Sequence, residues 1–192
     1  FSGGGALAIM EGVRMTINNA TFKNNTAENG GQGGGMFSSN VFDGVSGNRP
    51  LLSMSSSTFI GNKASTGNGG AMSLIETDAE APLNALYKAN AARVGAAMYL
   101  SRSSFSGIQA VITENIADVG GVIYGGGSTV GFVNTNISLN IAKTGNGGAM
   151  TSIFSIFDLN NVQLTENEAI DGDGGAISSS MQSSLIVKKS NF

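Results

Sequence analysis

The sequence predicts an all-β fold, a parallel β-helix extending over the whole of residues 1–192 with almost no α-helix. The heptapeptide Thr-Gly-Asn-Gly-Gly-Ala-Met occurs twice unchanged, at 66–72 and at 144–150. Looser copies of it recur along the chain, and an apolar residue followed three positions later by Asn recurs in phase with them. Self-similarity at a spacing of roughly 20–50 residues is the signature of a solenoid, in which each repeat packs on its neighbours.

The glycine motif marks one corner of each coil. Its second glycine, or the residue replacing it, falls at Gly5, Gly35, Gly70, Ala96, Gly121, Gly148 and Gly175. Glycine is required where φ is positive or where two backbones approach closely. We therefore expect one tight corner per coil at these positions.

The second motif predicts an internal ladder of asparagines. Its apolar and Asn members are Phe22 and Asn25, Phe59 and Asn62, Tyr87 and Asn90, Ile112 and Asn115, Ile137 and Asn140, and Leu164 and Asn167. Stacked Asn side chains can bond to the amide one coil away and to the turn backbone. Because a buried amide without a partner costs about 2–7 kcal/mol, we expect every member of the column to be paired.

The residues before each ladder member alternate between apolar and polar. In the first coil, 15–17 and 20–22 alternate on either side of the polar pair 18–19. Alternation with period two indicates strands, and a polar pair that resets the alternation indicates a corner. We expect about seven coils of 25–28 residues, each with about three short strands.

Composition excludes several functions. The net charge of −3 comes from scattered residues, which argues against nucleic-acid binding. The uncharged stretch 119–142 contains Gly, Asn, Ser and Thr throughout, so direct membrane insertion is not expected. The chain has no Cys and no His, the side chains that most often bind transition metals. We expect no metal, no cofactor and no catalytic residue.

One coil carries an insertion at about 38–50. Insertions in a solenoid leave the coil as loops, and such loops often form binding surfaces. Phe42 and Arg49 are the candidate contact residues of an interaction loop. A tolerated surface insertion without function is the alternative.

Two acidic segments are candidate chemical sites. Glu76, Asp78 and Glu80 form the densest cluster, and paired carboxylates can act as general acid and base. Asp171 and Asp173 supply some of the oxygens that a calcium loop needs, but not the full set. Solvated turns are the simpler interpretation of both segments.

Three N-glycosylation sequons begin at Asn19, Asn24 and Asn136. The alternation directs all three side chains outward. They matter for a protein secreted by a eukaryote.

The pairing of Gly-Gly-Ala-aliphatic with Phe-x-x-Asn, seen at 174–177, 22–25 and 59–62 and as Gly-Gly-Ala-Met at 69–72, resembles the repeat of chlamydial polymorphic membrane proteins. Similar repeats occur in large secreted proteins of algae and protists. The resemblance implies a right-handed, single-stranded β-helix of the pectin-lyase type. In the bacterial family such repeats form the passenger of an autotransporter adhesin.

We therefore expect a non-enzymatic rod of an extracellular or cell-surface protein, acting as a structural stalk or an adhesive surface. The chain opens at a glycine corner and stops at Phe192, a ladder position, so we expect a segment of a longer rod or end-to-end stacking. Expected partners are proteins or further copies, along or at the ends of the rod, and glycans. The alternatives are a subunit of an extracellular filament or coat with contacts around 119–142, and a carbohydrate-active lyase or hydrolase.

Overall fold

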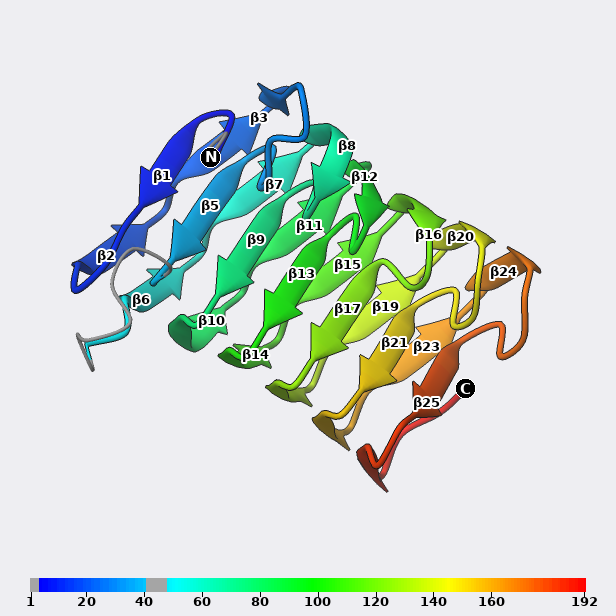
Figure 1. The fold of residues 1–192 in the computed structure, drawn as a ribbon. Helices are drawn as coiled ribbons and strands as arrows, with labels where there is room; N and C mark the ends of the chain where they lie inside the picture. The colour runs from blue at the N-terminus through cyan, green and yellow to red at the C-terminus, as the bar shows by residue number, and fades with distance from the viewer. Residues whose placement is uncertain (1–3, 41–47) are drawn as a thin grey trace.

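The computed structural model describes residues 4–40 and 48–192, and within them every regular element is a β-strand. The chain winds into stacked coils that form an elongated body, with its two termini at opposite ends (Figure 1). Every strand pairing is parallel, and each joins strands from adjacent coils. The predicted parallel β-helix is thereby confirmed.

Four parallel sheets, named A to D here, run the length of this body. Sheet A contains β1 (Leu7–Ile9), β5 (Met36–Ser39), β9 (Met72–Ile75), β13 (Met98–Ser101), β17 (Ile123–Gly126), β21 (Met150–Ile153) and β25 (Ile177–Ser180). Sheet B contains β2 (Arg14–Asn18), β6 (Leu51–Ser55), β10 (Asp78–Leu83), β14 (Ser104–Ile108), β18 (Thr129–Val133), β22 (Ile156–Asn160) and β26 (Ser184–Lys188).

The other two sheets have six strands each. Sheet C contains β3 (Thr21–Lys23), β7 (Thr58–Ile60), β11 (Leu86–Lys88), β15 (Val111–Thr113), β19 (Asn136–Ser138) and β23 (Gln163–Thr165). Sheet D contains β4 (Thr26–Ala27), β8 (Lys63–Asn68), β12 (Ala91–Val94), β16 (Ile116–Val119), β20 (Ile141–Thr144) and β24 (Glu168–Asp171). The described chain thus makes six complete turns and a partial seventh.

The expectation of about three strands per coil was wrong, because each complete coil has four. The ladder segment forms its own strand in sheet C, and the chain then turns and starts a further strand in sheet D. The residue before each ladder Asn makes this turn with a positive φ, at Asn24, Gly61, Ala89, Glu114, Leu139 and Glu166. Five of these six residues carry a Cβ, so the sequence gives no glycine signal for this corner.

The core consists of columns of like residues, one member from each coil. On sheet C the rings of Phe22 and Phe59 stack at 4.7 Å, and those of Phe59 and Tyr87 at 5.2 Å. Sheet D faces inward with an alanine column, Ala27, Ala64, Ala92, Ala117, Ala142 and Ala169. Small side chains there leave room for the inward column of sheet A, which includes the fully buried Met72 and Met98. Parallel in-register pairing thus places like residues on one another in these columns.

The two glycines of the corner motif have different roles. The first, such as Gly69, has a positive φ of 71°. The second, such as Gly70, has no room for a Cβ, which would lie 2.4 Å from the carbonyl oxygen of Ala96 in the next coil. Both reasons for glycine that the sequence suggested therefore occur, but at neighbouring positions.

One predicted corner position needs correction. Met36 pairs with Met72, so the residue equivalent to Gly70 is Gly34, and Gly35 instead aligns with Ala71. Three consecutive glycines at 33–35 made the sequence alignment ambiguous by one residue, and only strand pairing resolves it.

The longest connection within the first turns spans residues 40–50, between β5 and β6. The next coil joins the same two sheets with only Glu76 and Thr77. In the chain, the extra residues therefore fall between β5 and β6, within the interval predicted to hold an insertion. Among the described residues, no helix has the length and apolarity to cross a membrane.

Candidate functional site

The asparagine column is a continuous chain of amide hydrogen bonds. Each Asn from Asn25 to Asn140 donates its Nδ2 to the Oδ1 of the ladder Asn in the following coil, at 2.9–3.0 Å. The same Oδ1 also accepts the backbone N–H of the preceding ladder Asn, as in the 2.9 Å contact from Asn90 N to Asn115 Oδ1. A further bond runs backwards, for example from Asn90 Nδ2 to the carbonyl oxygen of Phe59 at 3.0 Å. The ladder thus ties the corner of every coil to both neighbouring coils.

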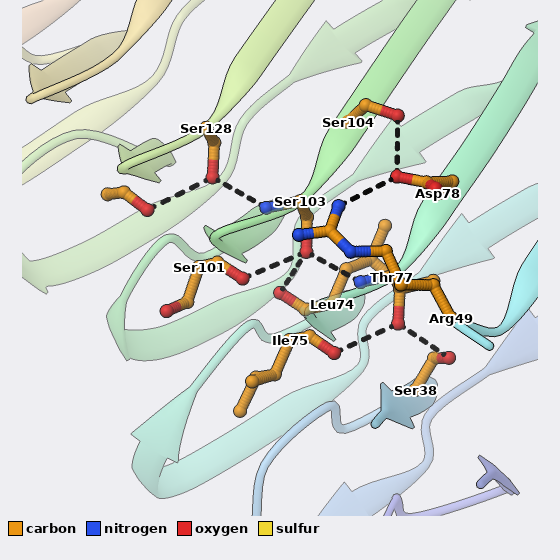
Figure 2. Close-up of polar contacts among 11 residues, drawn as sticks. Ser38, Arg49, Leu74, Ile75, Thr77, Asp78, Ser101, Ser103, Ser104 and Ser128 are labelled. Atoms are coloured by element: carbon orange, nitrogen blue, oxygen red, sulfur yellow. Dashed lines mark hydrogen bonds and ion pairs between the residues drawn. The ribbon is translucent and has the colours of Figure 1, made fainter. Parts of the chain in front are cut away.

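A second polar ladder lies at the corner between sheets A and B, and our reading of the sequence missed it. Its members are Thr77, Ser103, Ser128, Ser155 and Ser183. Each backbone N–H donates to the hydroxyl oxygen one coil on, and Figure 2 shows the contacts of the first three members. The hydroxyl of Ser103 in turn donates to the carbonyl oxygens of Ser101 and Leu74. The coil spacing could have revealed this column, but serine is too frequent in this chain for a single column to stand out.

The candidate interaction loop is partly placed. Phe42 lies outside the described residues. Arg49 is held against sheet B, where its Nη1 lies 3.1 Å from Asp78 Oδ1, and the same oxygen accepts a hydrogen bond from the Ser104 hydroxyl at 2.9 Å (Figure 2). Arg49 therefore anchors the end of the connection to the rod.

A groove of about 430 Å³ runs along the outer surface of sheet A. Its floor is formed by Tyr99, Tyr124, Thr151, Ile153, Ser178 and Ser180, from four successive strands of this sheet. Its wall is formed where sheet D meets the corners leading into sheet A, by Asn68, Arg93, Val94, Val119, Gly145 and Asn146. Floor and wall each cross three coil steps, about 14 Å at the usual spacing between strands. The volume is within the range of ligand sites, about 300–1,000 Å³.

The groove contains a pair of stacked tyrosines. Tyr99 and Tyr124 occupy the same register position in β13 and β17, with ring centroids 5.2 Å apart and planes inclined by 4°. Their neighbours in this column are Ser73 on one side and Thr151 on the other. Burial raises the pKa of Tyr124, and the neighbouring Tyr99 adds to the effect. The outer ring faces thus lie beside smaller side chains, and the pair forms an aromatic ridge on the groove floor.

The polar side chains that line the groove differ in their hydrogen bonding. The Thr151 hydroxyl accepts from Gly121 N at 2.8 Å and donates to the carbonyl oxygen of Asn146 at 2.6 Å, which fixes the wall against the floor. The Oδ1 of Asn68 is buried and has no hydrogen-bond partner. Buried polar atoms in native proteins are nearly always paired, by protein or by bound molecules. Asn68 thus lines the groove while its Oδ1 stays buried and unpaired.

The acidic residues are separated rather than brought to one centre. Glu76 pairs with Arg102 Nη2 at 2.6 Å, and Asp78 pairs with Arg49. Asp173 engages its turn through its backbone N–H, which donates to Asn146 Oδ1 at 2.8 Å. Within the described ranges, no cluster of three or more acidic side chains is arranged to hold a metal ion.

The three sequon asparagines are all solvent-exposed. Asn19 and Asn24 lie at corners with positive φ, and Asn136 lies in β19. Attachment of a sugar at any of them would require no rearrangement of the coil. Glycosylation stays a prediction.

Comparison of the chain with protein-family models, with curated proteins and with solved structures finds no match.

Proposed function

We propose that this chain is a non-enzymatic rod of an extracellular or cell-surface protein, serving as a stalk or as an adhesive surface. The observation that carries the proposal is the hydrogen bonding between coils. Four sheets, the asparagine ladder and the serine ladder all join adjacent coils through buried bonds. Burial in a low-dielectric interior strengthens such bonds and protects them from exchange with water. A load along the rod is therefore shared by many bonds.

Ion pairs on the surface also connect adjacent coils. The pairs Arg49–Asp78, Arg102–Glu76, Lys88–Glu114, Lys143–Asp118 and Lys188–Asp158 each connect one coil to the next. Exposed pairs contribute little stability, with a median of about 0–1 kcal/mol. Each pair places opposite charges on the exposed surfaces of adjacent coils.

Localisation is tested with an antibody raised against this chain and applied to cells that produce the protein. Staining of intact cells is expected. Staining that requires permeabilisation would overturn the extracellular role. The non-enzymatic role is tested by incubating the purified chain with acidic and neutral polysaccharides and measuring new reducing ends, of which none are expected above the level of heat-unfolded protein.

A filament or coat subunit is a second candidate, and an exposed apolar strip favours it. Val111, Ile116, Val119 and Leu139 are 38–46% exposed and lie on neighbouring coils over sheets C and D, close to the uncharged stretch 119–142. Light scattering across a concentration series separates the two candidates. A mass that stays monomeric supports the stalk or adhesive surface, whereas growth that Ile116→Lys abolishes supports lateral assembly.

A further inference from the structure

We propose that the groove on sheet A binds an extended acidic oligosaccharide, so that the adhesive surface of the rod recognises a glycan. This inference rests on the proposed role of the chain as an interaction surface and gives that surface a ligand class. It is carried by three features of the groove: the tyrosine ridge, the unpaired acceptor on Asn68, and the charge of its lining.

The tyrosine ridge suits sugar rings. Tyr99 and Tyr124 are half-buried, so their rings are fixed by the sheet while remaining open to the groove. The face of an aromatic ring is electron-rich, and the axial C–H groups on the face of a pyranose ring are electron-poor. A sugar can therefore pack on the ridge through its carbon skeleton while its hydroxyl groups point to the polar wall.

The wall offers partners for those hydroxyl groups. Asn68 lines the groove, and rotation of its side-chain amide would turn the buried, unpaired Oδ1 towards a sugar hydroxyl that donates to it. Asn146 is exposed at the groove edge, and its Oδ1 already accepts from Asp173 N, which fixes the orientation of the amide. The groove crosses several coils, as a chain of sugar units requires.

The charge of the groove points to an acidic sugar. The protein as a whole carries a net charge of −3. Nevertheless, of the described residues that line the groove, the one charged member is Arg93, whose side chain is exposed. A guanidinium binds a carboxylate in a planar, two-point geometry. An anionic ligand would find an attractive group here, and none of the described lining residues carries a carboxylate.

The same geometry disfavours a peptide. A peptide commonly binds by adding a strand to an open sheet edge. Strands β13, β17 and β21 under the groove are each paired on both sides, so the groove lies over a sheet face and no free edge is available there. A peptide ligand would have to bind through side chains alone.

The probes are two hexasaccharides of matched length. A hyaluronan hexasaccharide alternates glucuronate with N-acetylglucosamine, whereas chitohexaose contains N-acetylglucosamine units without a carboxylate. Isothermal titration of the full chain should show binding of the hyaluronan fragment, about tenfold or more weaker binding of chitohexaose, and weakening of the first by salt. Equal affinity for the two probes, or no binding of either, would overturn the proposal.

The repeat itself supplies variants that should fold. Tyr99→Ser and Tyr124→Thr introduce the residues that adjacent coils carry at the same register position, Ser73 and Thr151. Each should weaken binding of the acidic hexasaccharide about tenfold or more, in line with loss of a central aromatic contact. Arg93→Ser should remove the preference for the acidic probe over the neutral one.

The matched control is Arg102→Ser, which removes one positive charge at the corner between sheets A and B, outside the groove lining. It should leave both affinities unchanged. If Arg102→Ser weakens binding as much as Arg93→Ser does, the attraction is a general charge effect and the groove is not the site. Binding of a proline-rich peptide, lost in Tyr99→Ser while neither sugar binds, would assign the groove to peptides instead. If the titrations show no sugar binding but the antibody stains intact cells, only the glycan proposal is overturned. If the antibody stains cells only after permeabilisation, the proposed extracellular function is overturned.

Discussion

Asn90 and Asn115 are joined by two hydrogen bonds to one atom, because both the backbone N–H and the Nδ2 of Asn90 donate to Asn115 Oδ1 at 2.9 Å. The two residues are 25 positions apart and completely or almost completely buried. Asn115 repeats the arrangement with Asn140, at 3.1 and 3.0 Å. Each ladder Asn thus satisfies the backbone N–H of the ladder Asn in the preceding coil, and its own N–H needs an Asn in the next coil, which explains why the motif recurs in phase.

Replacing Asn115 by Ala should lower the free energy of unfolding by about 3 kcal/mol or more, because several buried donors and acceptors lose their partners together. These include the N–H of Asn90 and the carbonyl oxygen of Tyr87. Urea unfolding followed by circular dichroism measures the change. Asn136→Ala, at an exposed position of β19, is the control and should change stability little. Equal losses in the two variants would contradict the role given to the ladder.

Gly70→Ala should destabilise the protein by about 1–3 kcal/mol or more, as overpacking does. Its Cβ would lie 2.4 Å from Ala96 O and 2.5 Å from Ala91 O, which are backbone atoms that cannot rotate away. Gly131→Ala is the matched control, since its Cβ would meet nothing closer than 3.8 Å. The control should be neutral or slightly stabilising, because alanine restricts the unfolded chain. Comparison of thermal midpoints decides the matter.

Ser128→Ala should lower the free energy of unfolding by about 1–3 kcal/mol, since the buried N–H of Ser103 loses its acceptor. The effect should be smaller than that of Asn115→Ala, because a serine rung satisfies fewer groups. Ser106→Ala, at an exposed position of β14 in the preceding coil, is expected to be silent. A silent Ser128→Ala would mean that water replaces the hydroxyl at no cost.

Asn68→Val should raise the free energy of unfolding by about 1 kcal/mol while weakening any ligand of the groove. Valine is the residue that pairs with this position in the next coil, Val94, and it removes the buried oxygen without a partner. A gain in stability at the expense of binding is the pattern expected of a functional polar residue. Loss of both would assign Asn68 a structural role instead.

Alkaline pH should destabilise the protein through Tyr87. Burial raises the pKa of Tyr87 above the ordinary value of 10.0, so the folded state favours the neutral phenol. The sign follows from proton binding: the stabilisation is complete below pH 10 and is lost as the pH rises above it, because the unfolded chain then releases the proton first. Tyr87→Phe should flatten this loss, whereas Tyr99→Phe should retain it, as thermal midpoints measured across that range would show. A wild-type midpoint that stays constant above pH 10 would contradict the assignment.

Structural positions could be predicted from the sequence where one residue type recurs in every coil for one physical reason. The ladder asparagines and the apolar residues before them recur together because each Asn from Asn62 to Asn167 donates to the carbonyl oxygen of the apolar ladder residue one coil back, as Asn62 does to Phe22. The prediction was wrong where the residue types did not identify a unique structural position. Gly35 was chosen over Gly34 within a run of three glycines, and the corner before each ladder Asn was not recognised as separating two strands, because residues as different as Ala89 and Leu139 occupy it.

The sequence by itself determined the period, the parallel stacking and the buried asparagine column, because each coil has to repeat the contacts of the last and the repetition is visible in one dimension. The tertiary structure alone decided which outward residues meet. Tyr99 and Tyr124 are adjacent in one column, yet the groove they share with Asn68 and Arg93 depends on how the corner between sheets D and A folds over the face of sheet A. Outward residues are not constrained by core packing, so they do not have to recur with the period of the repeat. The groove on which the proposed ligand depends could therefore not be predicted from the sequence.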